Sequence, residues 1–159
     1  MAKIETIEEA HTMTTKTDFT PEEWDSVLQT PPTAGMIVLT AQSGGTFKET
    51  WAISKAYVEA RQQHGASELL DEIVSSKPEI DHTHFHSPQE LRDKGLQHLR
   101  DTVALLGTKA TPEDVTEFSR FILNLATKVA AAHREHGQDV SPAEHEAIQA
   151  IAQALGTPA

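Results

Sequence analysis

The chain has 159 residues, of which 38% are hydrophobic and 23% charged, which fits one globular domain with a buried core and excludes a disordered chain. Its formal net charge of −11 argues against nucleic acid as a main partner, because phosphate binding needs a stripe of Lys and Arg and none is present. With no apolar run long enough for membrane insertion, no signal-peptide pattern and no cysteine, we expect a soluble cytoplasmic protein without disulfides or thiolate metal sites.

The first helix start follows a polar segment. Residues 1–18 are rich in Thr and Glu, which predicts a flexible N-terminal tail ahead of a single all-α domain at residues 19–159. Residues 20–23 read Thr-Pro-Glu-Glu, in which the Thr hydroxyl caps a helix, Pro fits its first position and the last Glu caps in return. We expect this helix to end before Pro31, since proline disfavours helical geometry in the preceding residue.

The next segment is apolar on all sides. Residues 36–39 read Met-Ile-Val-Leu, which fits either a buried helix or a short central strand. We predict a helix at residues 34–41, because the neighbouring segments are helical and no second strand is available for pairing. Two further capped helices follow, at residues 46–63 and 67–74.

Three more helices complete the chain. They start at Ser87, Thr111 and Ser141, each of which begins the same Ser/Thr-Pro-x-Glu/Asp pattern as residues 20–23. Glycines at positions 107, 137 and 156 predict their ends. The sum is about seven helices with short connections, packed as a compact helical bundle.

Apolar stripes at helical spacing predict the core. Its expected aromatic members are Trp24, Trp51, Phe118 and Phe121. No serine elbow, phosphate loop or helical His-Glu-x-x-His motif occurs in the sequence, so an enzyme is the less favoured prediction.

The most unusual stretch is Asp-His-Thr-His-Phe-His at residues 81–86. In an extended chain His82, His84 and His86 lie on one side, within reach of a single ion. Imidazole ligands suit zinc, copper or nickel, so the sequence predicts a divalent metal ion, zinc-like or nickel-like, as the cofactor of a metal-dependent enzyme or metal sensor. The alternative is a solvated loop whose histidines bind metal adventitiously.

A second candidate metal group surrounds the last turn. It comprises His133, His136, Asp139 and Glu144, with His145 next to Glu144. The two histidines are three residues apart and share a helix face. The alternative is structural, because a His near a helix C-terminus interacts favourably with the dipole and a Glu at this position caps the next helix.

The last twenty residues carry a family resemblance. Residues 137–156, Gly-Gln-Asp-Val-Ser-Pro-Ala-Glu-His-Glu-Ala-Ile-Gln-Ala-Ile-Ala-Gln-Ala-Leu-Gly, resemble the closing helical hairpin of TerB-like proteins, the tellurite-resistance-associated family. That family is all-α and has two similar halves, each with a turn of Asp-Gly, then Ser or Thr, then Glu. The resemblance implies that residues 43–49 form the first turn here and residues 136–144 the second.

The two turns also resemble each other: in each, a helix ends at a glycine, a Ser or Thr caps the next helix, and a Glu follows three residues later. Two unrelated capping boxes would produce the same similarity. In the family, the acidic residues of the two turns would bind a divalent cation. In this chain the turn Asp is replaced by Ser43 in the first turn and by His136 in the second. The resemblance implies a non-enzymatic, stress-associated binding module, possible partners being another protein or a second copy of the chain.

Overall fold

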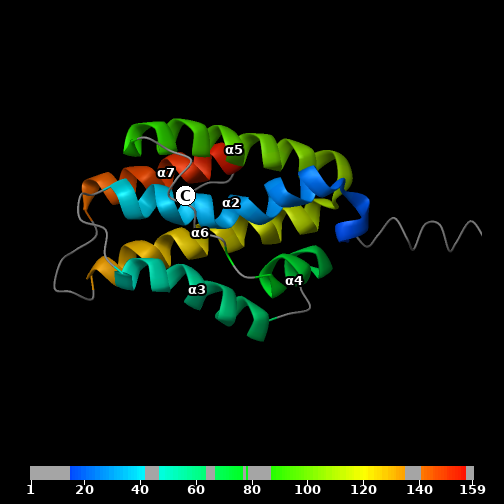
Figure 1. The fold of residues 1–159 in the computed structure, drawn as a ribbon, viewed down its shortest axis with the longest axis horizontal. Helices are drawn as coiled ribbons and strands as arrows, with labels where there is room; N and C mark the ends of the chain where they lie inside the picture. The colour runs from blue at the N-terminus through cyan, green and yellow to red at the C-terminus, as the bar shows by residue number, and fades with distance from the viewer. Residues whose placement is uncertain are drawn as a thin grey trace, which may run out of the picture.

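The computed structural model describes residues 15–41, 47–63, 67–76, 78, 87–134 and 141–156. These ranges contain a short 3-10 helix and six α-helices: η1 (Lys16–Asp18), α2 (Pro21–Ala41), α3 (Phe47–Gln62), α4 (Glu68–Ser75), α5 (Pro88–Lys109), α6 (Pro112–Arg134) and α7 (Pro142–Leu155). No strand occurs in the ranges given above, so the all-α prediction is confirmed for them (Figure 1).

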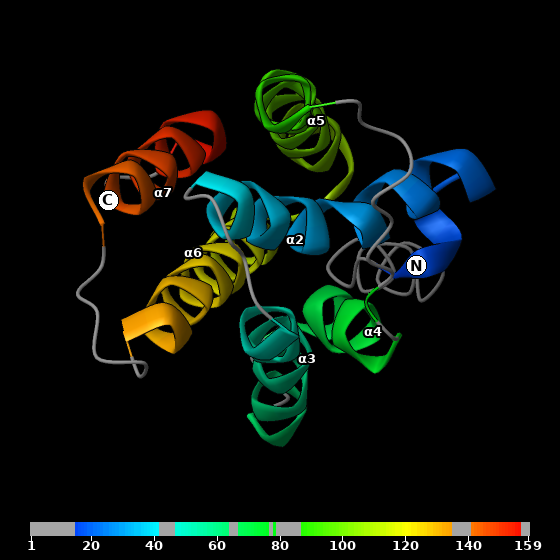
Figure 2. The same ribbon diagram turned by 60° about the vertical axis from the view of Figure 1, so that its left-hand side comes forward.

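Helix α2 is the centre of the bundle. It packs against α3, α5, α6 and α7, and Figure 2 shows these helices arranged around it. Because neighbours cover it on several sides, the side chains of Met36, Ile37 and Val38 are all buried. The prediction of a helix rather than a strand at this apolar run is therefore confirmed.

Two glycines allow helices to approach each other closely. A Cβ atom on Gly35 of α2 would lie 2.7 Å from Cδ1 of Ile53 on α3 and 2.9 Å from Cδ2 of Leu125 on α6. A Cβ atom on Gly95 of α5 would lie 2.8 Å from Cδ1 of Ile37 on α2. All three distances are shorter than real Cβ contacts, so a side chain at either glycine would displace the neighbouring Ile or Leu side chains.

The predicted end of the first helix before Pro31 is wrong. Helix α2 continues through Pro31 and Pro32, so the two helices expected on either side of the prolines are one. Polar side chains support the turn just before them: the Thr30 hydroxyl donates to the Ser26 carbonyl at 2.7 Å, and Nε2 of His98 on α5 lies 2.8 Å from the same oxygen. Contacts from a neighbouring helix thus stabilise a segment that local propensity disfavours.

The four predicted helix starts are confirmed. In each, a Ser or Thr hydroxyl accepts a hydrogen bond of 3.0 to 3.1 Å from the backbone N–H three residues on, the four caps being Thr20, Ser87, Thr111 and Ser141. The returning hydrogen bond to a carboxylate is also present at Glu23, Asp114 and Glu144. These local motifs set where the helices begin.

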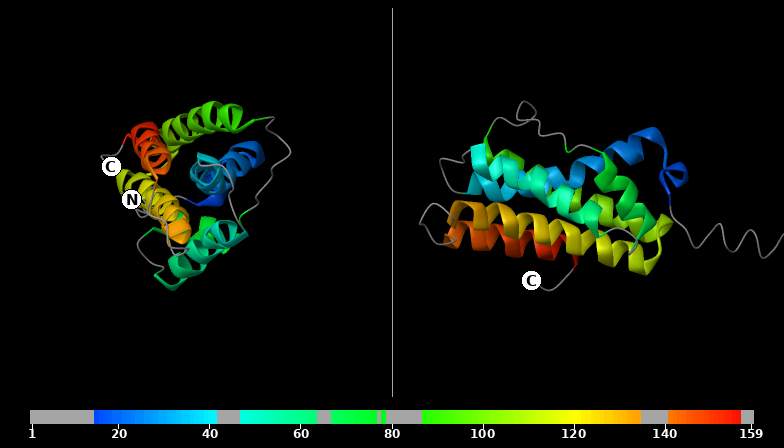
Figure 3. Two further views of the ribbon diagram at one scale, coloured as in Figure 1. Left: turned by 90° about the vertical axis from the view of Figure 1, so that its left-hand side faces the viewer. Right: turned by 90° about the horizontal axis from the view of Figure 1, so that it is seen from below.

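Helix ends agree less closely with the glycine pattern. Helix α5 runs past Gly107 to Lys109, whereas Gly156 ends α7 in the left-handed conformation with φ of 73°. The predicted end at Gly137 lies outside the described residues. Figure 3 shows α6 and α7 side by side, which agrees with the contacts between them and with the predicted closing hairpin.

The predicted tail is described only from Thr15. Its last three residues form η1, whose Lys16 N–H donates to a carboxylate oxygen of Glu72 on α4 at 3.0 Å. The Asp18 carbonyl accepts from the ammonium group of Lys109 at 3.1 Å. This end of the tail therefore contacts both α4 and α5.

The aromatic core is confirmed at three of four positions. Trp24, Phe118 and Phe121 are buried, whereas the side chain of Trp51 is 60% exposed. The Trp51 prediction is wrong because the stripe that α3 buries runs through Ile53, and Trp51 lies on the other side of the helix.

Candidate functional site

Most of the predicted metal ligands lie outside the part of the chain that the structure describes. This holds for the backbone or the side chain of His82, His84, His86, His133, His136 and Asp139. The first turn expected from the family resemblance, residues 43–49, is likewise undescribed up to residue 46. The metal sites built on these residues stay predictions.

The seventh predicted ligand, Glu144, is a helix cap. Its side chain is buried, and one carboxylate oxygen accepts a hydrogen bond from the Ser141 N–H at 3.0 Å. The Ser141 hydroxyl accepts from the Glu144 N–H at 3.1 Å in return. Among the residues that the structure describes, no group of three or more His, Asp or Glu side chains is close enough to hold a metal ion. The capping alternative accounts for the geometry of Glu144.

A different surface stands out on α3. The side chains of Trp51 and Val58 are 60% and 46% exposed. Among the residues that the structure describes, they are the large hydrophobic side chains exposed to solvent. The Lys55 ammonium lies 5.5 Å from the centre of the Trp51 ring, a cation–π geometry. We call the surface formed by Trp51, Lys55, Val58 and Arg61 the outer face of α3.

Helical geometry explains this outer face. Trp51 and Val58 are seven residues apart, which brings both to one side of a helix with 3.6 residues per turn. The opposite side is buried through Ile53 and Tyr57, whose ring meets that of Phe121 edge-on at 5.2 Å between centroids. Burial also raises the pKa of the Tyr57 hydroxyl well above its usual range. The helix thus has an apolar residue on each side, and only one side is covered.

Arg61 connects the outer face to the end of α4. Its Nε donates to the Val74 carbonyl at 2.5 Å and its Nη2 to the Ser76 carbonyl at 3.4 Å. A cation at the C-terminus of a helix interacts favourably with the helix dipole. Arg61 therefore fixes α4 against α3 and keeps one positive charge next to Val58.

A small pocket lies between α3, α4 and α6, with a volume of about 160 Å³. Its apolar lining includes Ala56, Ala60, Leu70 and Phe121. Its charged lining consists of three carboxylates and two cations: Glu59, Asp71, Glu117, Arg120 and Lys128. We call it the α3–α4–α6 pocket. Most of its lining residues are therefore polar or charged.

Two ion pairs line this pocket, one between α6 and α3 and one within α6. The Lys128 ammonium donates to a carboxylate oxygen of Glu59, and Nη1 of Arg120 lies 3.0 Å from Oε1 of Glu117. The hydrogen bond from Lys128 lowers the pKa of the Glu59 carboxyl below its usual range, so this group is ionised at neutral pH. Both cations of the pocket therefore have carboxylate partners.

Neither surface was predicted from the sequence. Glu59 and Lys128 are 69 residues apart, so no local spacing reveals that they meet. For Trp51 a signal was present, because Trp51 and Val58 do not share the helical stripe of Ile53, Ala56 and Tyr57.

In the ranges that the structure covers, no helix is both long and apolar enough to cross a membrane. Comparison of the chain with models of protein families, with curated proteins and with solved structures gave no match.

Proposed function

We propose that this protein is a non-enzymatic binding module that docks a protein partner on the outer face of α3. The exposed Trp51 is the observation that carries this proposal, because Trp is a large side chain that is highly buried on average. Trp is also enriched among the residues that dominate binding energy in protein interfaces. Val58, on the same side of the helix, enlarges the apolar surface that a partner would cover.

The charges of this face indicate the chemistry of the partner. Its ionisable groups, Lys55 and Arg61, are both cationic, although Glu59 on the flank of the same helix interacts with Lys55 and pairs with Lys128. Complementary potentials guide association and disfavour wrong partners. The occupant is therefore a protein surface with apolar side chains flanked by carboxylates.

The kinship with TerB-like proteins, and with it a stress-associated role in the cytoplasm, belongs to this proposal. The closing hairpin supports it, since α6 and α7 pack together and α7 has both the Ser141 capping box and the left-handed Gly156. The proposal of a role in tellurite resistance rests on the family resemblance. The proposal of metal-ion binding rests on the histidines of residues 82–86.

Intrinsic fluorescence tests the proposed docking face. The variant Trp24→Phe removes the buried Trp, so that Trp51 alone reports on its surroundings. The probes are two amphipathic helical peptides with identical leucine positions, in which the remaining positions carry either Glu or Lys. We expect a blue shift of Trp51 emission and tighter binding with the Glu peptide, because its carboxylates meet Lys55 and Arg61.

Matched substitutions distinguish specific binding at the outer face of α3 from nonspecific binding of the peptide. Val58→Ser and Lys55→Glu should weaken binding of the Glu peptide, whereas Arg100→Glu, an equivalent charge change on the exposed side of α5, should not. No blue shift with either peptide, or equal binding of both, would contradict the proposal. Light scattering at two concentrations identifies a second copy as the occupant if a dimer forms and Trp51→Ser abolishes it.

A further inference from the structure

Residues 4–9 of the chain complement the outer face of α3. They read Ile-Glu-Thr-Ile-Glu-Glu, which combines two large apolar side chains with three carboxylates and contains no Lys or Arg. On the outer face the apolar side chains of Trp51 and Val58 are exposed. The ionisable side chains beside them, Lys55 and Arg61, are exposed cations. Residues 4–9 therefore have the chemistry that we infer for a partner of this face.

The described part of the chain begins close to one end of the outer face. The Lys16 N–H donates to a carboxylate oxygen of Glu72 on α4 at 3.0 Å. Two residues further along α4, the Val74 carbonyl accepts from Nε of Arg61. Figure 1 shows η1 and the C-terminal end of α3 toward the same end of the bundle. Residues 1–14 therefore join the fold near the Arg61 end of the outer face.

The connection to the described fold is long enough for residues 4–9 to reach this face. Arg61 and Trp51 are ten residues apart, which is about 15 Å along an α-helix. Glu9 precedes Thr15 by six residues, and an extended chain spans about 3.3 Å per residue, so this connection covers up to about 20 Å. A short tether gives an effective concentration on the order of 1 mM. A contact with a dissociation constant of about 0.5 mM would then form in most molecules.

We propose that residues 4–9 bind the outer face of α3 within the same chain and compete there with the protein partner. Ile4 and Ile7 cover the apolar surface of Trp51 and Val58, and the three Glu side chains lie next to the two cations. Burial of apolar surface stabilises the contact, and the opposite charges orient it. This inference rests on the proposed function, because it concerns the regulation of the same docking face.

A second stretch of the chain has related chemistry and supplies a control. Residues 79–81 read Glu-Ile-Asp, with Ile80 as the one isoleucine. The chain that contains them must also reach Ser87 at the start of α5, and α5 packs against α2, α6 and α7. We therefore expect Ile80→Ser to leave the outer face unchanged.

Trp51 emission in the full chain tests the internal contact. In the Trp24→Phe background, the double Ser variant, Ile4→Ser with Ile7→Ser, should shift the emission to longer wavelength, because Trp51 loses its apolar cover. Ile80→Ser should not. Added salt should cause a similar shift in the parent chain, since it screens the ionic part of the contact, and little change in the double Ser variant. The indole N–H signal of Trp51 in NMR spectra reports the same contact without the Trp24→Phe change.

The Glu peptide described above measures the competition. At the effective concentration estimated here, the double Ser variant should bind this peptide about threefold more tightly than the native chain. The triple variant Glu5→Gln, Glu8→Gln, Glu9→Gln should change the affinity in the same direction, because it removes the carboxylates that face the cations. Circular dichroism confirms that each variant remains helical.

The outcomes distinguish the internal contact from the proposed docking function. Unchanged Trp51 emission and unchanged peptide affinity in the double Ser variant would contradict the internal contact, while binding of the Glu peptide would still support the docking face. A shift to longer wavelength without any peptide binding would support the internal contact and contradict docking of a partner. A dimer in light scattering that the double Ser variant abolishes would show that residues 4–9 bind a second copy, and would overturn binding within one chain.

Discussion

The hydroxyl of Ser67 donates a hydrogen bond of 2.7 Å to the carboxylate of Asp114. The same hydroxyl accepts from the Leu70 N–H at 3.2 Å, and the same carboxylate accepts from the Thr111 N–H at 3.3 Å. One buried pair, 47 residues apart in the sequence, therefore serves the N-termini of both α4 and α6. This pair fixes two of the three walls of the α3–α4–α6 pocket relative to each other.

The substitution Gly35→Ala should lower the free energy of unfolding by about 1 to 3 kcal/mol, because the new methyl group overpacks the contact with Ile53 and Leu125. Urea denaturation measures the change. Gly107→Ala is the matched control, since Gly107 lies in α5 with nothing within 4 Å of its Cβ position. It should raise the free energy of unfolding by about 0.5 to 1 kcal/mol. Stabilisation by both changes would contradict the close approach at Gly35.

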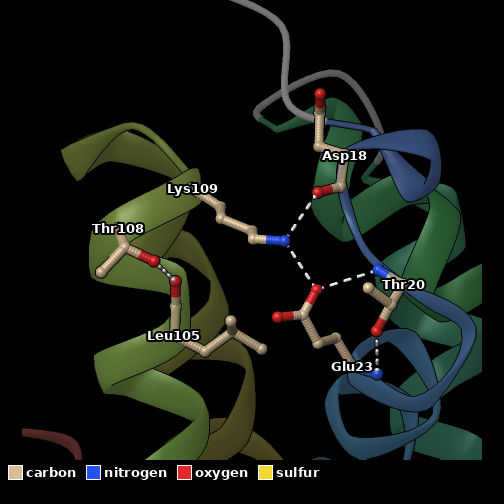
Figure 4. Close-up of polar contacts among 6 residues, drawn as sticks. All are labelled: Asp18, Thr20, Glu23, Leu105, Thr108 and Lys109. Atoms are coloured by element: carbon tan, nitrogen blue, oxygen red, sulfur yellow. Dashed lines mark hydrogen bonds and ion pairs between the residues drawn. The ribbon is translucent and has the colours of Figure 1, made fainter.

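The contact of Lys109 with Glu23 predicts a pH dependence (Figure 4). The Lys109 ammonium lies 2.6 Å from Oε1 of Glu23, and its hydrogen bond lowers the pKa of that carboxyl below the usual range. A carboxyl with a lowered pKa in the folded state stabilises the fold above its unfolded pKa of about 4.3 and loses this contribution as pH falls through the folded value. Lys109→Met should therefore destabilise the protein at pH 7 and progressively less as the pH falls below about 4.

Urea titrations at pH 7, 5 and 3 measure this effect. In a Glu23→Gln background, Lys109→Met should produce no such pH-dependent loss, because the titrating partner is absent. Added salt should reduce the effect in the native background, since both side chains are partly exposed. A loss that is equal at all three pH values would show that Lys109 acts through the Asp18 carbonyl and the Phe19 ring rather than through Glu23.

Two substitutions in α7 distinguish the contribution of its N-terminal cap from that of its packing against the core. Ser141→Ala should cost roughly 1 kcal/mol, because it removes the hydroxyl that accepts from the Glu144 N–H. Ile151→Ala should cost about 2 to 5 kcal/mol, because this side chain is fully buried. Thermal or urea unfolding compares the two. Small losses of similar size would mean that α7 does not contribute to the core.

Calorimetry with zinc and nickel tests the predicted metal site. A metal sensor or a metal-dependent enzyme would show a site of micromolar or tighter affinity that is lost in the triple variant His82→Ala, His84→Ala, His86→Ala. Glu144→Gln should retain it, because Glu144 belongs to the second candidate group and caps α7. Equal heats for the native protein and the triple variant would remove both the metal sensor and the metal-dependent enzyme.

Local chemistry predicted the helix starts, and long-range contacts overturned one predicted end. The box beginning at Thr20 involves residues three apart, so its geometry follows from the sequence alone. The break expected at Pro31 also follows from local rules, but His98 on α5 and the hydroxyl pair of Thr30 and Thr102, 2.9 Å apart, pack against this turn. No local pattern contains these partners, because they lie about 70 residues away.

The outer face of α3 and the α3–α4–α6 pocket could not be predicted from the sequence, because they also depend on contacts between distant residues. A helical stripe in α3 shows that one side is buried, but apolar residues on both sides leave open which one. The close approach of α3 to Gly35 settles this, since it brings Ile53 inward and leaves Trp51 outward. The pocket is harder to foresee, because its lining comes from three helices whose packing the sequence does not state.

The central position of α2 has a consequence for synthesis of the chain. Residues 21–41 are synthesised before the helices that cover them, which include α6 and α7, ending at residues 134 and 155. Until those segments emerge, the apolar side chains of Met36, Ile37 and Val38 lack most of their final covering. The native packing of α2 is therefore completed only after α7 has been synthesised.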